Sequence, residues 1–468
     1  MDADADYGLL SPAWAGTRGA ARTGDRRLLQ AMLDVELAWL EVLAGAGIVP
    51  ASVPGAVAPA CRADLYDPAS LAARSAGGGN PVIPLLSDLR ARVRKEDPAA
   101  AAAVHLAATS QDILDTALML VAADALQVIR EDTGRTVTAL AGLAVEHRRT
   151  LCVARTLTQH SLPSTFGLRA AQWLHGIGAA AAGLDAAAAR LPLQWGGASG
   201  TLAALRTTVD GSASTAAPLE LSDALAARLG LAAPPAPWQA NRLPVTGLGA
   251  ALQDLLSAAG KTANDVLLMS RPEIGEVSEP RAAGRGGSSA MPQKQNPVLS
   301  VLIRSAALAA PGYGVQLQTA AGTADDDRPG GSWHVEWQAL RSLLRLAAGA
   351  SEKLAELTEG LVVHRPALQR NLAAAGPLVV SERLMATVAP LLEEAGRPGS
   401  GRARLQELVS ASLAGGASLA GLLRNALPAQ VLSDEALAAE LDPANYLGES
   451  STLIDRIIAA YPEGTDAL

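Results

Sequence analysis

The residue types best suited to chemistry lie in one short segment, 284–297, which reads GRGGSSAMPQKQNP. Its glycines and prolines predict an irregular loop before a helix. Lysine occurs in this chain only at positions 95, 261, 294 and 353, and one of the four lies in this loop. A compact cation beside hydroxyl and amide groups can stabilise an enolised carboxylate. Composition alone favours a flexible linker, whereas the lysine favours a catalytic loop. The segment contains neither GxxxxGK[ST] nor GxGxxG, so it is not a nucleotide-binding loop.

A second polar group, HLAATSQDILDT at 105–116, opens a long apolar stretch. Thr109 followed by Asp112 fits a capping box, so we expect a helix to begin there. The N-terminus of a helix attracts anions, and Thr109 and Ser110 add hydroxyl groups to it. The sequence therefore predicts a carboxylate-binding site at the start of this helix.

Long alanine- and leucine-rich stretches predict the elements that must position these residues. Alanine is the strongest helix former and lets helices pack closely, so we predict an all-α fold with a bundle of long helices. Expected helices start at Leu28, Leu85 and Thr109 and cover roughly 131–155, 164–190, 215–230, 244–272, 296–320 and 332–360. We expect three consecutive parts: an N-terminal helical domain (1–108), a central bundle carrying the loop 284–297 (109–364) and a C-terminal helical domain (365–468).

Composition excludes several classes of protein. The chain has a net charge of −8 and only 3% aromatic residues, which argues against nucleic-acid binding. Cys61 and Cys152 lie far apart and flank no zinc-binding spacing, so neither a disulfide scaffold nor a metal site is expected. The acidic start MDADAD does not fit a secretion signal, and polar residues and glycines interrupt the apolar stretch 305–324. We expect a cytoplasmic protein that spans no membrane.

The loop sequence GSSAMPQKQNP closely resembles the signature of the fumarase/aspartase superfamily. Segment 105–116 is similar to the superfamily's H-x-G-x-T-S-x-D region, and RTLTQHSLPSTFG at 155–167 is similar to its R-T-x-x-Q-x-A-x-P-x-T region. The resemblance covers most of the chain. It implies a long-helix bundle completed by homotetramerisation, active sites shared between three subunits, a small polycarboxylate substrate and no cofactor.

Within the superfamily, the resemblance is strongest to the 3-carboxy-cis,cis-muconate cycloisomerase branch. The segments that carry it are TSQD at 109–112, WGGASGT at 195–201, Arg328 with GSWHVEW at 331–337, and DPANYLG at 442–448. Leu157 stands where purine-type lyases have a histidine acid, which argues against adenylosuccinate lyase activity. Ala107 replaces a usual glycine. Gln293 and Gln295 stand where cycloisomerases often have histidine and arginine, so the substrate's charge or size is expected to differ.

The resemblance implies a reaction that removes or adds a proton next to a carboxylate. The resemblance implies that Ser288 is the catalytic base, with Ser289 as the alternative. It also implies that Lys294 and Asn296 bind the enolised carboxylate. His160 is the candidate proton donor. The remaining expected substrate-binding residues are His105, Thr109, Ser110, Arg155, Thr158, Gln159, Arg242, Met291 and Arg328.

Three functions fit these residues. In the first, a carboxylate of 3-carboxymuconate adds across a double bond to close a lactone, as in aromatic catabolism; we expect this one because the end-to-end resemblance is strongest there. In the second, a succinate derivative loses a nitrogen group and leaves fumarate, as in nitrosuccinate lyases of specialised metabolism. The third is a structural protein, as in crystallins related to argininosuccinate lyase. The intact loop with Ser288, Lys294 and Asn296 favours an enzyme.

Overall fold

A computed structural model describes residues 7–287, 290–291, 293–394, 397–415 and 417–462. Contacts divide the chain into two compact units of three segments each. Unit 1 comprises Met1–Thr133, Ile177–Ala263 and Leu299–Ala355, and unit 2 comprises Gly134–Gly176, Asn264–Val298 and Glu356–Leu468. The three consecutive domains expected from the sequence do not coincide with these units, because long helices run from one unit into the other.

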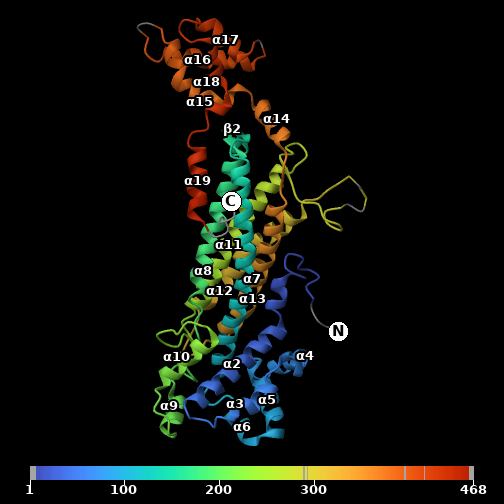
Figure 1. Cartoon of the computed structure of the whole chain (residues 1–468), viewed down its shortest axis with the longest axis vertical. Helices are drawn as coiled ribbons and strands as arrows, with labels where there is room; N and C mark the ends of the chain where they lie inside the picture. The colour runs from blue at the N-terminus through green and yellow to red at the C-terminus, as the bar shows by residue number, and fades with distance from the viewer. Residues whose placement is uncertain (1–6, 288–289, 292, 395–396, 416, 463–468) are drawn as a thin grey trace. The chain divides into compact units, whose positions relative to one another are not determined.

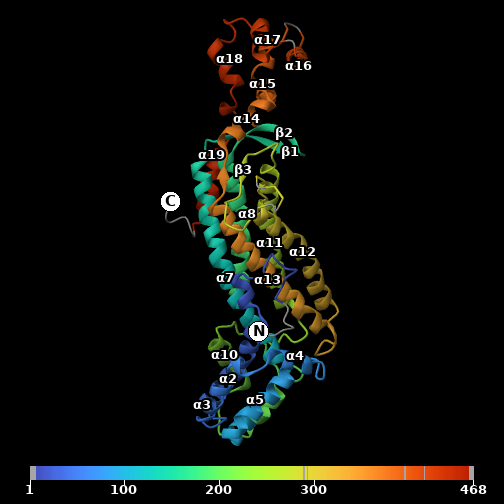
Figure 2. The same cartoon turned by 90° about the vertical axis from the view of Figure 1, so that its right-hand side faces the viewer.

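Helices dominate the described part of the chain (Figures 1 and 2). The long ones are α2 (Asp25–Gly45), α5 (Val82–Glu96), α7 (Ser110–Glu146), α8 (Phe166–Ala188), α11 (Leu243–Met269), α12 (Val298–Gly322) and α13 (Ser332–Glu359). The shorter ones are α1 (Arg18–Arg22), α3 (Val53–Val57), α4 (Pro68–Ser75), α6 (Pro98–Ala103), α9 (Ala203–Asp210), α10 (Pro218–Leu229), α14 (Arg365–Ala375), α15 (Ser381–Thr387), α16 (Ser400–Leu413), α17 (Leu419–Ala426), α18 (Asp434–Leu441) and α19 (Ser450–Ala460). Five 3-10 turns are η1 (Ala58–Ala60), η2 (Ala63–Leu65), η3 (Pro377–Val380), η4 (Ala389–Leu392) and η5 (Pro443–Asn445). The all-α prediction is confirmed.

Small residues let the long helices of unit 1 pack closely. A Cβ added at Gly260 of α11 would lie 2.6 Å from the Cβ of Ala307 on α12, closer than two carbons can approach. A Cβ added at Gly249, also on α11, would meet Leu317 of α12 and Leu343 of α13. Glycines of α11 therefore let these three helices approach closely, a role that the sequence analysis gives to alanine.

Unit 2 contains a β-hairpin where the sequence predicts the end of a helix. Helix α7 runs unbroken to Glu146, so the expected helix 131–155 is wrong at both of its bounds. Strands β1 (Leu151–Thr156) and β2 (Gln159–Thr165) pair antiparallel, with a register shift between Val153 and Arg155. A second small sheet pairs β3 (Val277–Ser278) with β4 (Val362–Val363).

The C-terminal helices of unit 2 share an apolar core. Buried leucines and valines from α14 to α18 pack with Val153 of β1. Because Val153 belongs to the hairpin, this core anchors the base of the hairpin against the C-terminal helices.

Helix α12 combines an apolar composition with an exposed face. Among the described residues it alone is long and apolar enough to cross a membrane by length and composition, and 33% of its most apolar stretch is buried. Its exposed side chains include Val301, Leu308 and Val315, which recur every seven residues and so share one face.

Candidate active site

The start of α7 in unit 1 brings two predicted site residues together. The helix begins at Ser110, and the Thr109 N–H donates to the Asp112 carboxylate at 3.0 Å, so the predicted helix start is confirmed. Arg328, more than 200 residues away in sequence, donates from Nη2 to Thr109 Oγ1 at 2.7 Å. The same nitrogen donates to the Ala198 carbonyl at 3.3 Å. An exposed guanidinium therefore lies against the N-terminus of a long helix, and both favour an anion.

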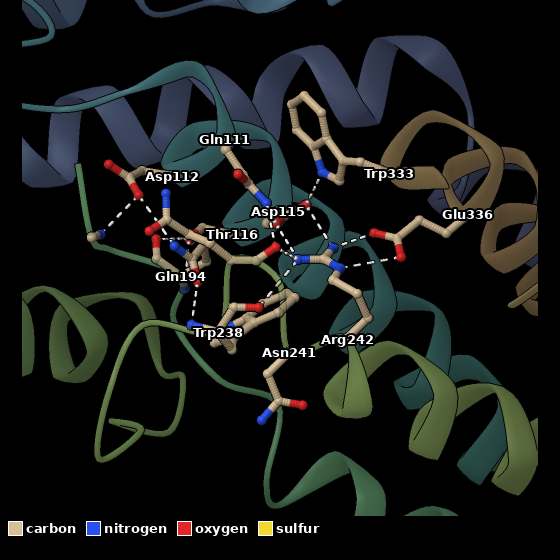
Figure 3. Close-up of polar contacts among 12 residues, drawn as sticks. Gln111, Asp112, Asp115, Thr116, Gln194, Trp238, Asn241, Arg242, Trp333 and Glu336 are labelled. Carbon is tan, nitrogen blue, oxygen red and sulfur yellow. Dashed lines mark hydrogen bonds and ion pairs between the residues drawn. The ribbon is translucent and has the colours of Figure 1, made fainter. Parts of the chain in front are cut away.

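Asp112 fixes the segment that faces this helix start. Its buried carboxylate accepts the N–H groups of Gly196 at 2.9 Å and Gly197 at 3.0 Å, in addition to that of Thr109. Burial raises the pKa of Asp112 to about 7, and these N–H donors act in the opposite direction by stabilising the carboxylate. Figure 3 shows Asp112 beside Gln194, whose backbone hydrogen-bonds to Thr116 of α7. Segment 194–197 is thus tied to the first turns of α7.

Beneath the helix start, Arg242 lies between two buried carboxylates (Figure 3). It donates from Nη1 to Asp115 at 2.8 Å and also forms an ion pair with Glu336. Trp333 donates from Nε1 to Asp115 at 2.8 Å, and Gln111 donates to it at 3.2 Å. The network therefore links α7 and α13 to the residue that precedes α11.

The charges of this network change its pKa values. Burial alone would lower the pKa of the Arg242 guanidinium, but Asp115 and Glu336 raise it above its usual value. Burial raises the pKa of Glu336 to about 7, although Arg242 opposes the shift. Only 1% of the Arg242 side chain is exposed, and its guanidinium nitrogens bind the carboxylates of Asp115 and Glu336. We therefore revise the sequence-based role of Arg242 from substrate clamp to internal ion-pair partner.

His105 is anchored to α2. Its Nδ1 lies 2.7 Å from Oε1 of Glu36, a fully buried carboxylate. Both His105 and Ala107 have positive φ values, 64° and 57°, in the region that favours glycine. Ala107 is the position where the superfamily usually has glycine, so the backbone conformation explains that preference. The contact with Glu36 fixes the orientation of the His105 ring, while its substrate-binding role stays a prediction.

The base of the loop 284–297 in unit 2 is closed by its own backbone. Gly287 pairs with Gln295 in an antiparallel bridge, and the Asn296 N–H donates to the Gly286 carbonyl at 2.8 Å. Gly286 has a φ of 73°, and a Cβ there would lie 2.7 Å from the Asn296 carbonyl oxygen, so only glycine fits. Lys294 is exposed and Asn296 is half-buried.

The predicted base lies in that loop but outside the described residues. This holds for both Ser288 and Ser289, whose roles stay predictions. Met291, the other substrate-binding residue expected there, is 43% exposed.

The hairpin of unit 2 is locked at Arg155. Its guanidinium donates two hydrogen bonds to Glu276, at 2.9 and 2.7 Å, and this hydrogen bonding raises the pKa of Arg155. Glu276 is fully buried and also accepts from Asn371 of α14 at 2.8 Å. Arg155 is only 11% exposed, so we revise its role from substrate clamp to anchor of the hairpin.

The tip of the hairpin presents the other expected residues to solvent. Thr158, Gln159 and His160 are all exposed. Leu157 is 96% exposed, and both Leu157 and Thr158 have positive φ values, 50° and 70°. Two residues other than glycine or asparagine in this conformation strain the turn, and such strain is typical of functional sites.

Comparison with known proteins identifies the family. A family model described as "Lyase" matches residues 75–312. The chain is 44% identical to nitrosuccinate lyase from Streptomyces davaonensis over 97% of this chain and 94% of that protein. It is 37% identical to 3-carboxy-cis,cis-muconate cycloisomerase from Bradyrhizobium diazoefficiens over 96% of this chain and 97% of that protein. The chain belongs to this lyase family.

A solved structure supports the same assignment for the lyase. The 3-carboxy-cis,cis-muconate lactonizing enzyme from Pseudomonas putida matches with a TM-score of 0.87 and 34% identity, over 98% of this chain and 99% of that one. The lyase therefore belongs to an enzyme family of the fumarase/aspartase superfamily, as its sequence motifs predict.

Several buried residues that bind the candidate arginines are not evident from the sequence. Asp115, Glu276 and Glu336 are buried carboxylates whose arginine partners lie 94 to 127 positions away. The sequence does contain a feature that points to Asp115: this carboxylate follows Asp112 by three residues in a helix that is otherwise apolar there. Among the described residues, no group of three or more His, Cys, Asp or Glu side chains is arranged to hold a metal ion.

Proposed function

We propose that this lyase catalyses β-elimination from a succinate derivative, with nitrosuccinate as the substrate and fumarate and nitrite as the products. The observation that carries the proposal is the 44% identity to nitrosuccinate lyase over almost the whole of both chains, against 37% for a cycloisomerase at similar coverage. The proposal thus favours elimination, the second of the functions that fit the sequence.

The available cations support a substrate with two carboxylates. The sequence offers four candidate cations, Arg155, Arg242, Lys294 and Arg328. Protein carboxylates neutralise Arg155 and Arg242. The exposed Arg328 and Lys294 are left to match the two carboxylates of nitrosuccinate, whereas 3-carboxymuconate carries three. The loop's Gln293 and Gln295, which add no charge, agree with the smaller substrate.

The proposed reaction assigns roles to three residues of the loop. Ser288 removes a proton from the CH₂ carbon beside one carboxylate, and Lys294 and Asn296 hold the doubly charged carboxylate that results. The electron pair then forms the carbon–carbon double bond while the C–N bond breaks, and nitrite leaves with the bonding electrons. Thr109, Ser110 and Arg328 hold the second carboxylate.

Nitrite is a stable anion and needs no proton to leave. Leu157, which cannot donate a proton, is therefore compatible with this leaving group. Thr158 and Gln159 contact the substrate from the hairpin tip, and His160, the candidate proton donor, is not required for this elimination.

That second candidate is lactone formation from 3-carboxymuconate. It is favoured by cycloisomerase relatives at 37–38% identity and by the solved lactonizing enzyme. In this addition a carboxylate oxygen bonds to one carbon of the double bond, and the hydroxyl of Ser288 donates a proton to the carbon beside the enolised carboxylate. Both reactions therefore use Ser288 and the same enolised carboxylate, so one variant tests the shared chemistry.

We further propose that the lyase works as a cytoplasmic homotetramer whose copies share their active sites. The support is the face of α12 that carries Val301, Leu308 and Val315, which are 50%, 72% and 65% exposed. Arg304 is the one charged residue of this 25-residue helix. An apolar stripe of this length on a surface helix favours burial against other copies.

The proposed function is tested by offering purified protein both substrates. We expect fumarate to appear with nitrosuccinate, and the rate to fall by about 10³-fold or more in Ser288→Ala, because the base is lost. Ser410→Ala, a serine exposed on α16, is the control and keeps full activity. Loss of the 3-carboxymuconate diene absorbance without fumarate release from nitrosuccinate would instead support the second candidate.

A further inference from the structure

The glycine-rich turn at 196–201 of unit 1 is held in place from three sides. Asp112 accepts its first two N–H groups, those of Gly196 and Gly197. Gln239 donates from Nε2 to the Gly197 carbonyl at 2.8 Å, and the Leu202 N–H closes the turn on the Gly196 carbonyl at 3.0 Å. The turn therefore has a fixed shape before any ligand arrives.

Glycine is required for that shape. A Cβ at Gly196 would lie 2.8 Å from Pro237 and 2.9 Å from Gln239. Gly200 has a φ of 76°, and a Cβ there would lie 2.7 Å from the same glutamine. Glycine at these two positions therefore lets the turn pack directly against Pro237 and Gln239.

The outer part of the turn keeps donor groups available. Ala198 and Ser199 are exposed, and within the described residues neither their N–H groups nor the Ser199 hydroxyl has a hydrogen-bond partner. Arg328 lies against this part of the turn through its bond to the Ala198 carbonyl and reaches Thr109 with the same nitrogen. A cation, a helix N-terminus and unused donors thus meet at one place, while the nearby Asp112 carboxylate is buried and already accepts three N–H groups.

We propose that the turn at 196–201 is part of the substrate-binding surface, and that Ser199 binds the carboxylate of the substrate that is not enolised. The ligand's identity rests on the proposed function; the anion site itself rests on the geometry of Arg328, Thr109 and the turn. Because these donors are held in position before binding, little conformational entropy is lost when the ligand binds. Hydrogen-bond donors beside a cation favour a charged carboxylate over a neutral ester or amide. Ser199 is then a specificity-determining residue.

The inference is tested by measuring fumarate binding calorimetrically and nitrosuccinate kinetics in Ser199 variants of the full chain. Ser199→Ala is expected to raise both the fumarate Kd and the KM about tenfold, the loss of one hydrogen bond to a charged group, with kcat changed much less. Ser199→Thr keeps a hydroxyl and restores binding, whereas Ser199→Asp abolishes it by charge repulsion. Ser410→Ala is the matched control.

The outcomes separate this inference from the proposed function. If nitrosuccinate is not consumed but Ser199→Ala still weakens fumarate binding and Ser199→Thr restores it, the anion site stands and the proposed reaction fails. If turnover occurs while Ser199→Ala leaves Kd and KM unchanged, the role of Ser199 is wrong and the reaction stands. Absence of fumarate binding to the unmodified protein would overturn the inference as well.

Discussion

Asp115 and Glu336 share one guanidinium, that of Arg242, inside unit 1. Two carboxylates and one arginine leave a net negative charge in a buried place, which water cannot stabilise. Burial is the main cause of the raised pKa of Glu336, and the charge of Asp115 adds to it, so a proton on Glu336 removes the unbalanced charge. The network therefore holds α7, α13 and the start of α11 together more firmly when Glu336 is protonated.

Glu336→Gln should flatten the pH dependence of stability. The pKa of Glu336 rises from 4.5 to about 7 on folding, so its contribution to stability is complete below 4.5 and is lost as the pH rises through 7. From about pH 5 to about pH 8 we expect the unfolding free energy of the unmodified protein to fall by about 1–3 kcal/mol relative to the variant. Urea unfolding of both proteins across this range checks it. Asp112 is present in both proteins, so its contribution to the pH dependence cancels in the comparison. If the unfolding free energies of the two proteins depend on pH in the same way, the role of the network is contradicted.

The three arginines of the candidate site show what residue type alone cannot tell. Arg155, Arg242 and Arg328 are equivalent as carboxylate binders in the sequence. Only the structure separates Arg328, which is exposed beside Thr109, from the two whose guanidinium groups bind buried carboxylates. Each partner carboxylate lies in another segment, so the pairing depends on tertiary structure that no local spacing encodes.

At the scale of elements, the β1–β2 hairpin depends on the bond between Arg155 and Glu276. This pair joins β1 to the segment just before β3, and Asn371 adds a contact from α14. The strained tip carrying Thr158 and His160 is held by an anchor several residues away.

Arg155→Lys should loosen the hairpin without unfolding unit 2. Lysine keeps the charge but cannot make the two parallel hydrogen bonds, so we expect amide exchange across 151–165 to accelerate about tenfold and kcat/KM to fall by a similar factor. Hydrogen exchange followed by mass spectrometry measures the first effect. Arg404→Lys, in an exposed pair with Glu407, is the control. Unchanged exchange in the hairpin would show that Arg155 does not anchor it.

Long helices were predictable because an apolar pattern repeats over many turns, as in α11 and α13. The hairpin was not, because its strands are short, its register shifts after Val153, and Leu157 and Thr158 fill turn positions that usually hold glycine or asparagine. The continuity of α7 was also missed. Its charged Asp132 is buried against Arg18, an ion pair from the N-terminal segment that lets a polar stretch continue as helix.

At the scale of the whole molecule, the proposed tetramer depends on α12. Leu308→Glu places a charge in the middle of its apolar face, where the side chain is 72% exposed in the single chain. We expect the variant to dissociate and to lose activity by more than about 10-fold, since a charge buried without a partner is costly. Light scattering after size-exclusion chromatography measures the mass.

Leu413→Glu, on the similarly exposed residue of α16, is the matched control and keeps the mass of the unmodified protein. A Leu308→Glu variant that retains both mass and activity would exclude this face as the interface.

The sequence motifs identify the family and most candidate residues, but they do not assign those residues to unit 1 or unit 2, because the motifs are separated along the chain and the units interleave.

The stoichiometry of nitrite and fumarate formed from nitrosuccinate tests the proposed elimination. Elimination releases equal amounts of the two products, and we expect both to depend on Ser288 and neither on His160. Consumption of 3-carboxymuconate with no nitrite released from nitrosuccinate would contradict it and assign the chain to lactone formation.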